Sequence, residues 1–201
     1  IAAVIDFPSA VVWTVTNFVP SAEALDKMPQ ILTSLVSTIL SAVASSVVGG
    51  IFAYILAVLG SRSVGIGGPT SIIVRGIASL FRNIPAVAWS FLLLFSFSQS
   101  EFTGFLVLFL GSFGYLTRCF LETIDEISMG VIEALRATGA SYLQIVVQAV
   151  IPLSITSVVS WLLYMVETNI RDATLVGILT GTGIGFVFNI YYKSFDYDIA
   201  A

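Results

Sequence analysis

The sequence predicts an all-α fold, a bundle of helices that crosses a membrane several times. Hydrophobic residues make up 57% of the 201 residues and charged residues only 10%, whereas soluble domains carry about 25% charged residues. The few charged residues divide the chain into uncharged intervals, most of which are long enough for the helix of about 20 residues that a bilayer requires. Helices are expected there because they satisfy their own backbone hydrogen bonds in lipid.

The composition also excludes several kinds of function. Lys and Arg number 8 against 12 Asp and Glu, a net charge of −4, which leaves no basic excess for binding a nucleic-acid backbone. There is no His, and Cys119 is the single cysteine, so the chain cannot build a Cys/His zinc site, an intrachain disulfide or His-dependent acid–base chemistry. We expect no catalytic residue, no metal ligand and no nucleic-acid partner.

The first predicted span lies between Lys27 and Arg62, an interval without a charged residue. Residues 31–59 can form one long helix, and small residues within it, such as Gly49, permit the close approach of a neighbouring helix. Residues 1–30 are expected to form an extracytoplasmic or interfacial segment.

The second and third spans are expected to form a hairpin. Residues 84–98 are few but strongly apolar, and the amphipathic stretch 71–81 is expected to extend this helix into the membrane interface. Glu101 marks a turn, and residues 102–117 make the return crossing.

The fourth span is predicted to start near Pro152. Residues 137–166 are uncharged, but the proline interrupts them, so a short surface helix followed by a span fits better than one continuous helix. The orientation follows from the basic residues, because short loops rich in Lys and Arg face the cytoplasm. The two connections assigned to the cytoplasm carry Arg62, Arg75, Arg82, Arg118 and Arg136.

The segment 173–192 is uncharged and rich in glycine. Glycine at this density disfavours a continuous helix, and irregular backbone at membrane depth is tolerated only where protein or a water-filled cavity covers it. We therefore expect a re-entrant element that acts as an outer gate, with an ordinary glycine-rich fifth span as the alternative. The glycines are Gly177, Gly181, Gly183 and Gly185.

The connection 122–152 is expected to be structured. Apolar residues recur every three or four positions, which indicates one amphipathic helical face. Thr123 and Glu126 fit a capping box at its start, and Gly139 fits a left-handed stop at its end. A second capping box, Ser141 with Gln144, starts another helix. Such an element suits docking into a groove on a cytosolic partner, although a plain capped surface helix also explains the pattern.

The same connection resembles a known family. Glu133-Ala134-Leu135, then Gly139 and later Ile151-Pro152, are similar to the EAA signature of ABC importer permeases, with Leu135 and Ala149 departing from its Ala and Ile. Other segments resemble the phosphonate branch of that family, and together they cover about residues 31–197. These segments are Arg82 to Trp89, the EALRATG run from Glu133, the YMVETNIR run from Tyr164, Thr174 to Gly177, the TGIGF run from Thr182, and Phe195-Asp196-Tyr197.

The resemblance implies a MetI-like ABC importer permease of the bacterial cytoplasmic membrane, which takes up phosphonate or a related phosphorus oxyanion. It implies three protein partners: cytosolic ATPase subunits that hold ATP and Mg, an extracytoplasmic binding protein, and a second copy of this chain in a homodimer. The chain itself has no G-x-x-x-x-G-K-[ST] loop and is expected to bind no cofactor. Residues 31–201 would be the permease core, and in that family one further helix lies at each end.

The resemblance also assigns roles to residues. Coupling to the ATPase falls to Glu133, Ala134, Gly139 and Pro152. Arg82, Asn83 and Pro85 start a core helix, where the plain interpretation is a first-turn proline with Arg82 reaching the lipid headgroups. A polar pathway or gate would use Glu167, Asn169, Arg171, Thr182, Gly183 and Gly185.

Other functions are alternatives. Glu167 and Arg171 also fit an ordinary i,i+4 ion pair. The permease could carry another small solute, such as an amino acid. An ATP-independent carrier or a channel is a further alternative, although carriers usually show two related halves and no internal repeat is found here. An intramembrane enzyme would need a nucleophile with a base, and without His only carboxylates remain.

Overall fold

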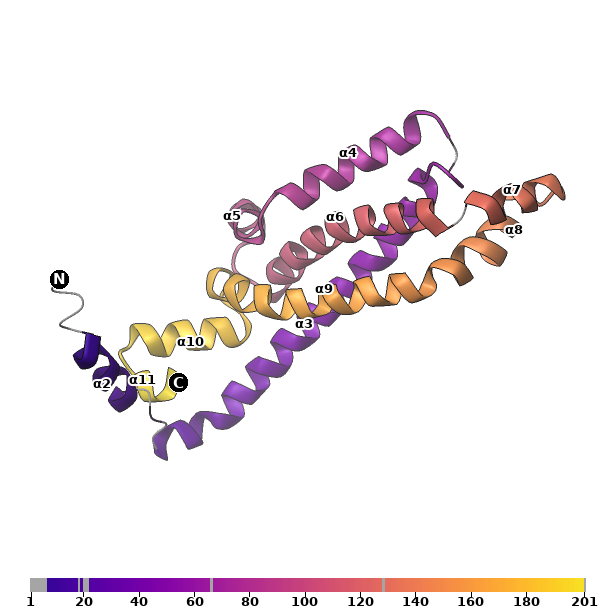
Figure 1. Cartoon of the computed structure of the whole chain (residues 1–201). Helices are drawn as coiled ribbons and strands as arrows, with labels where there is room; N and C mark the ends of the chain where they lie inside the picture. Colours follow the sequence, from indigo (N-terminus) through magenta and orange to yellow (C-terminus); the bar gives the residue numbers. More distant parts are fainter. Residues whose placement is uncertain (1–6, 18, 20–21, 66, 128, 201) are drawn as a thin grey trace.

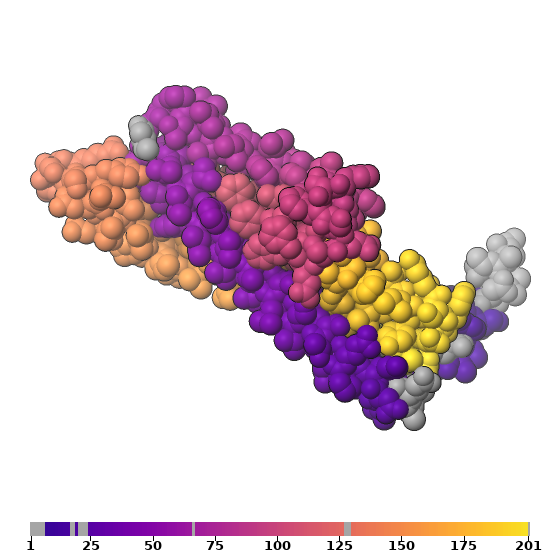
Figure 2. Space-filling view, turned by 180° about the vertical axis from the view of Figure 1, so that it is seen from behind, coloured from indigo at the N-terminus to yellow at the C-terminus, as the bar shows by residue number. Residues whose placement is uncertain are grey.

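The computed structural model describes residues 7–17, 19, 22–65, 67–127 and 129–200, and every regular element among them is helical. The helices form an elongated bundle, with α3 running diagonally along its whole length (Figure 1). The predicted all-α fold is confirmed. Among the described residues, three helical stretches are long and apolar enough to cross a membrane, or four if one bent pair is counted as a span. Figure 2 shows the same elongated shape from behind.

Helix α3 (Ala22–Gly60) is the predicted first span, and at 39 residues it is longer than expected. It packs along α6 (Glu101–Ile127), and the two backbones approach closely where small residues meet. A Cβ added to Gly49 would lie 3.1 Å from the Cβ of Ser112. The expectation that glycine permits close helix approach is confirmed at this position.

Helices α4 (Pro69–Asn83) and α5 (Ala86–Phe97) meet at an angle of 91°. The prediction that residues 71–81 extend the following helix is therefore wrong. Ile84 and Pro85 are both extended, with ψ of 116° and 150°, because proline disfavours a helical conformation in the residue before it and cannot donate a helical hydrogen bond. Pro85 is thus the residue that precedes the first turn of α5.

The corner between α4 and α5 lies beside the middle of α6. A Cβ added to Gly114 would lie 2.6 Å from the backbone nitrogen of Arg82, and Gly114 is near the centre of α6. Helix α4 lies along α6 (Figure 1). Arg82 is exposed there, and the prediction that it reaches the lipid headgroups stays a prediction.

Helix α6 continues well beyond the predicted end of the third span at residue 117. Thr123 and Glu126 lie inside its last turns, so the prediction that they start a new helix is wrong. The helix continues because Leu116, Phe120 and Ile124 form one fully buried stripe at a spacing of four. No proline or glycine interrupts the chain there.

The connection after α6 contains two short helices at one end of the bundle (Figure 1), α7 (Met129–Ala137) and α8 (Tyr142–Ile145). Both local predictions between them are confirmed. Gly139 has a φ of 82°. The Ser141 and Gln144 capping box is formed, with the Ser141 backbone N–H donating to Gln144 Oε1 over 2.8 Å.

Pro152 does not separate a surface helix from a span as predicted. Helix α8 continues through a π-helical turn (Val146–Val150) into α9 (Ile151–Thr180), and residues Tyr142–Thr180 count as one apolar stretch. The backbone N–H of Ile151 donates to the Val146 carbonyl, one residue farther back than in an α-helix. Widening the turn directly before Pro152 lets the helix continue past a residue that has no N–H.

The glycine-rich segment 173–192 forms a bent pair of helices. Helix α9 ends at Thr180, Gly181 is left-handed with a φ of 73°, and α10 (Gly183–Lys193) follows. Helix α10 packs against α9 and α3 and runs back along α3. Its first turn binds Thr38 through the Ile184 N–H, and Tyr191 donates to Gln30. The segment is therefore no continuous fifth helix, and α10 leads away from the end that carries α7.

Two short helices complete the described chain, α11 (Tyr197–Ala200) and α2 (Phe7–Asn17). Both lie near the far end of the bundle from α7 (Figure 1). Trp13 and Tyr197 pack edge to face with ring centroids 5.1 Å apart. Residues 22–30 belong to α3, and the placement of the remaining residues before 31 at the membrane surface stays a prediction.

Candidate functional site

The element formed by α7 and α8 presents one face to solvent and anchors the other. Ile132 and Ile145 are buried and pack into the same hydrophobic cluster as Phe120. Glu133 and Leu143 are exposed, Leu143 to 71%. An exposed leucine beside polar side chains at the tip of a bundle suits a docking surface.

The turn between α7 and α8 requires glycine. The Ala140 N–H donates to the Leu135 carbonyl over 3.1 Å, and the Gly139 N–H donates to the Arg136 carbonyl over 3.0 Å. These bonds close the helix end only with Gly139 in the left-handed region, where other residues are strained. Of the residues predicted to couple to an ATPase, Glu133, Ala134 and Gly139 lie together here. Pro152 is exposed but lies farther along, in the first turn of α9.

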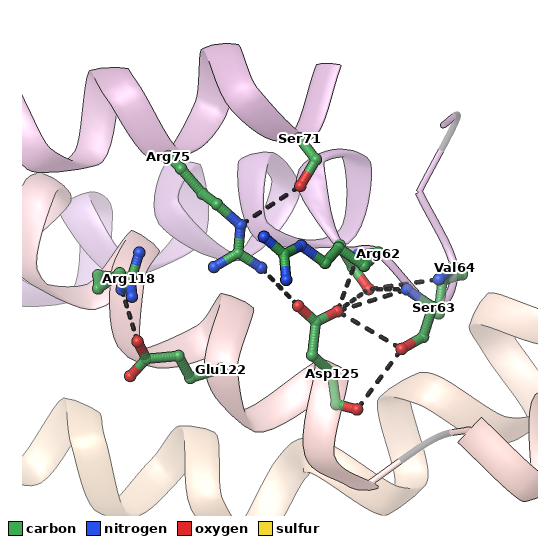
Figure 3. A network of polar contacts seen from close by, with 9 residues as sticks. Arg62, Ser63, Val64, Ser71, Arg75, Arg118, Glu122 and Asp125 are labelled. Carbon is green, nitrogen blue, oxygen red and sulfur yellow. Dashed lines mark hydrogen bonds and ion pairs between the residues drawn. The ribbon is translucent and has the colours of Figure 1, made fainter. Parts of the chain in front are cut away.

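A network of hydrogen bonds around Asp125 connects three parts of the chain at this end of the bundle (Figure 3). The Asp125 carboxylate accepts hydrogen bonds from Ser61 Oγ at 2.7 Å, from the Arg62 backbone N–H at 2.8 Å, and from Arg75 Nη2 at 2.6 Å. It therefore joins α6, the loop after α3, and α4. The side chains of Arg75 and Asp125 are only 18% and 17% exposed.

The same network reaches α7. Arg136 Nη2 donates to the backbone carbonyl of Ser63 over 3.0 Å, and the Ser63 N–H lies 3.4 Å from Asp125 Oδ1. The sequence analysis did not predict the role of Asp125, because it is one of several acidic residues in this part of the sequence. The available signal was an acidic side chain in the last turn of a helix, where the dipole disfavours it unless a cation is near, but that signal needs the true end of α6.

The predicted pathway residues on α9 lie on different faces. Arg171 and Glu167 form an ion pair of 3.1 Å with side chains 69% and 71% exposed, which confirms the ordinary i,i+4 pair. Asn169 is 2% exposed, and its side-chain nitrogen donates to Ser46 and Ser112 over 2.8 and 2.6 Å. Asn169 thus joins α9 to α3 and α6, and the structure does not bring it together with the exposed pair.

Three hydrogen bonds hold the turn between α9 and α10, two of them from other parts of the chain and one within the turn. Thr38 on α3 accepts the Ile184 N–H over 2.9 Å, Gln99 Nε2 donates to the Leu179 carbonyl over 3.2 Å, and the hydroxyls of Thr180 and Thr182 lie 3.0 Å apart. These bonds fix the place where the backbone changes direction.

Each of the four glycines in this segment has a structural reason. Gly181 and Gly183 have φ of 73° and 62°, which suits residues without a Cβ. A Cβ on Gly177 would collide with the Thr182 carbonyl oxygen, and one on Gly185 with the Thr174 carbonyl oxygen. Two glycines therefore form the bend, and two let α9 and α10 pack closely.

The residues predicted to start a core helix lie at the corner between α4 and α5. Arg82 and Pro85 line a cavity of about 200 Å³ between this corner, α6 and α9. Asn83, the last residue of α4, is exposed and is not among the lining residues.

Residues 49–201 match the family described as "Binding-protein-dependent transport system inner membrane component". The chain belongs to this family. It is 27% identical over 184 residues to the phosphate-import permease protein PhnE of Mycolicibacterium smegmatis, which covers 92% of this chain and 34% of that protein. It is 25% identical over 152 residues to the phosphite transport system permease protein PtxC of Stutzerimonas stutzeri, which covers 76% of this chain and 55% of that protein.

A third relative is the putative cryptic phosphonate transport system permease protein PhnE2 of Escherichia coli, 38% identical over 80 residues, or 40% of this chain and 66% of that protein. The chain thus spans between about a third and two thirds of the length of these relatives. Among solved structures, a chain of the MetNI methionine ABC transporter in an inward-facing conformation matches with a TM-score of 0.67 at 22% identity, over 81% of this chain and 82% of that chain. This likeness shows a shared fold.

Membership in this family places the permease in the inner membrane as a multi-pass protein, as predicted. The outward faces of its long helices agree with this environment. Leu40 and Phe52 on α3, and Leu163 on α9, are between 52% and 65% exposed, which suits contact with lipid chains.

Proposed function

We propose that this chain is the membrane-spanning permease subunit of an ATP-driven importer for phosphonate or a related phosphorus oxyanion. The observation that carries the proposal is the family match over residues 49–201, together with relatives that are named as phosphate, phosphonate and phosphite permeases. An external binding protein delivers the substrate, and the permease works with a second copy of itself around a central pathway.

The α7 and α8 element docks on a cytosolic ATPase subunit. The exposed Glu133 and Leu143, on a base anchored by Ile132 and Ile145, support this role, because an exposed helical face on a fixed base suits a groove in a partner. ATP and Mg bind to the ATPase, and this chain binds no cofactor.

Polar contacts transmit a displacement of α7 to the centre of the bundle. Arg136 binds the Ser63 carbonyl, and Asp125 binds the loop that contains Ser63 and also Arg75 on α4. Helix α4 is uninterrupted over its 15 residues and ends at the corner beside the middle of α6. A displacement of α7 therefore moves this corner, which provides a contiguous mechanical connection.

The segment 173–192 acts as the outer gate. The bend at Gly181 and its bonds to Thr38 and Gln99 support this role, because a small number of hydrogen bonds holds it in one position. Opening exchanges these bonds for others when the two permease copies rearrange.

Uptake by the assembled transporter tests the function. The permease, its ATPase and its binding protein are reconstituted in proteoliposomes, and ATP-dependent accumulation of labelled ethylphosphonate, phosphite, phosphate and methionine is measured. We expect accumulation of at least one phosphorus oxyanion and none of methionine. Accumulation of methionine alone would establish an amino-acid importer, and accumulation without ATP would establish a carrier or channel.

A further inference from the structure

Five aromatic side chains gather at the end of the bundle that lies far from α7 (Figure 1). They belong to α2, α10, α11 and the turn between the last two helices, and we call them the aromatic cluster. Tyr197 is its centre, with ring centroids 5.1 Å from Trp13, 5.6 Å from Tyr192 and 6.0 Å from Phe195. Phe188 stacks on Tyr192 at 5.6 Å. The cluster therefore joins α2 to α10 through ring contacts.

The aromatic cluster differs from a hydrophobic core because its rings remain exposed. Trp13, Phe188 and Tyr192 are between 40% and 49% exposed, and Phe195 is 76% exposed. A group of large exposed rings marks a surface that binds another apolar partner. Trp and Tyr combine an apolar ring with a polar N–H or hydroxyl, and they are enriched where a bilayer meets water.

The charges of α3 place the aromatic cluster at the level of the lipid headgroups. No charged residue lies between Lys27 and Arg62, and this interval is about 50 Å long at 1.5 Å per residue. A bilayer with its headgroup regions measures about 40–45 Å, so a tilted helix brings Lys27 to one surface and Arg62 to the other. Ala24 and Met28 line a groove together with α11. Tyr197, at the start of α11, is thus close to the level of Lys27.

Helix α2 fits the same surface. Its 11 residues include no charged side chain, and residues 7–16 are all exposed. At a length of about 17 Å, it is too short to cross about 30 Å of hydrocarbon. The hydroxyls of Thr14 and Thr16 donate to carbonyls of the same helix over 2.8 and 2.7 Å, so they add little polarity. An exposed, uncharged helix that cannot span the bilayer suits a position along its surface.

The exposed surface of α3 identifies lipid as the partner of the aromatic cluster. Leu25, Leu32, Val36 and Leu40 follow one another at intervals of four or seven residues, so they lie on one side of the helix. Each is more than half exposed. This stripe extends from the lipid-facing middle of α3 to the level of Lys27, so lipid chains reach that level along the molecule. Charged residues of both signs lie at this level or next to the rings in sequence, namely Asp26, Lys27, Lys193, Asp196 and Asp198.

We propose that α2 and the aromatic cluster bind the headgroup region of the bilayer and anchor α10 to the membrane surface. Trp13 connects α2 to Tyr197, and Tyr197 connects to Tyr192 on α10. The partner is the phospholipid surface and no single headgroup, because adjacent charges of both signs favour neither anionic nor cationic lipid. This anchor goes beyond the proposed function and holds for any transported solute.

Spin labels on single cysteines measure the depth of α2. The complete transporter, with Cys119→Ala in the permease and cysteine-free partner subunits, is reconstituted in vesicles of phosphatidylethanolamine and phosphatidylglycerol. Collisions of the label with oxygen, which concentrates in lipid, are compared with collisions with a nickel chelate, which stays in water. Leu40→Cys on α3 is the lipid reference, and Gly67→Cys in an exposed loop is the water reference. Val12→Cys should give an oxygen-to-nickel collision ratio between these two references.

Each other result for Val12→Cys overturns the proposal. A ratio equal to that of Gly67→Cys places α2 in water, and one equal to that of Leu40→Cys places it in the hydrocarbon. Protection from both reagents places it against protein, either a second copy of the chain or a partner subunit. The ratio should stay the same in vesicles without phosphatidylglycerol, and a shift there would contradict binding without headgroup selectivity.

A label at Lys193→Cys, the last residue of α10, tests the connection to this helix. Trp13→Ala should raise the mobile fraction of this label about threefold, the effect of losing one aromatic pair. Trp13→Phe, which keeps a ring, should leave it unchanged. Phe95→Ala, which removes an exposed ring outside the aromatic cluster, is the matched control. An unchanged mobile fraction in Trp13→Ala would overturn the anchoring of α10. These labels are measured without substrate, so failure to import any phosphorus oxyanion would refute the proposed function alone.

Discussion

The guanidinium of Arg75 lies 2.6 Å from the carboxylate of Asp125 and joins α4 to the last turn of α6. The free carbonyls at the end of a helix disfavour an anion there, and Arg75 with the Ser61 hydroxyl and the Arg62 N–H compensates for it. Because both side chains are largely buried, removal of one partner leaves the other charge without compensation. We therefore expect this pair to hold α4 to the end of the bundle that carries α7.

Replacing the carboxylate tests the connection. Asp125→Asn removes the charge that binds Arg75, and we expect a loss of about 1–3 kcal/mol in stability together with reduced uptake at retained ATPase activity. Thermal unfolding and ATP-driven uptake of the reconstituted complex measure the two effects. Glu122→Gln breaks the more exposed pair with Arg118 and should change stability by less than about 1 kcal/mol. Equal effects of the two variants would contradict a special role for Asp125.

The turn at Gly139 provides a second prediction. Gly139→Ala places a Cβ on a left-handed residue with a φ of 82°, which costs about 1–2 kcal/mol and should misplace α8 relative to α7. We expect ATP hydrolysis to become independent of substrate while the protein still inserts in the membrane. Gly130→Ala is the matched control, because a Cβ there meets nothing within 4 Å. Glu133→Ala should act more mildly than Gly139→Ala, since it removes one exposed side chain.

The contact between α9 and α10 gives a third prediction. Gly177→Ala introduces a Cβ that collides with the Thr182 carbonyl in the turn before α10, and Gly185→Ala one that collides with the Thr174 carbonyl of α9. Backbone cannot move aside as a side chain does. Each variant should lower the unfolding temperature and reduce uptake. Gly76→Ala places its Cβ in open space and should be neutral or slightly stabilising, because glycine is a poor helix former. A neutral Gly185→Ala would show that the helices are not packed this closely.

Local patterns predicted the structure better than patterns that depend on distant contacts. The capping box at Ser141 and the left-handed Gly139 involve neighbouring residues, and both are formed. The end of α6 was predicted too early, because a burial stripe that continues to Ile124 outweighs a local capping signal at Thr123. The cavity that Arg82 and Asp172 both line was not predictable, since these two residues lie far apart in sequence and only the packing of α4, α5, α6 and α9 places them around it.

The glycine-rich segment supplies the last prediction, which concerns the side of the membrane that Lys193 faces. Helix α10 runs back along α3 from Thr38 towards Gln30, away from the end that carries α7. Since we propose that the α7 end faces the cytoplasm, Lys193 should face outwards. In a Cys119→Ala background, Lys193→Cys should react with an impermeant thiol reagent in intact cells. Gly67→Cys, which is exposed at the opposite end, should be protected until the cells are opened. If Lys193→Cys reacts only after the cells are opened, the segment crosses the membrane and the outer-gate proposal is wrong.

If Lys193→Cys reacts in intact cells, Thr38→Val, which removes the acceptor of the Ile184 N–H, should change the labelling rate at Thr182→Cys. Such a change ties the hydrogen bond at the bend to opening of the gate.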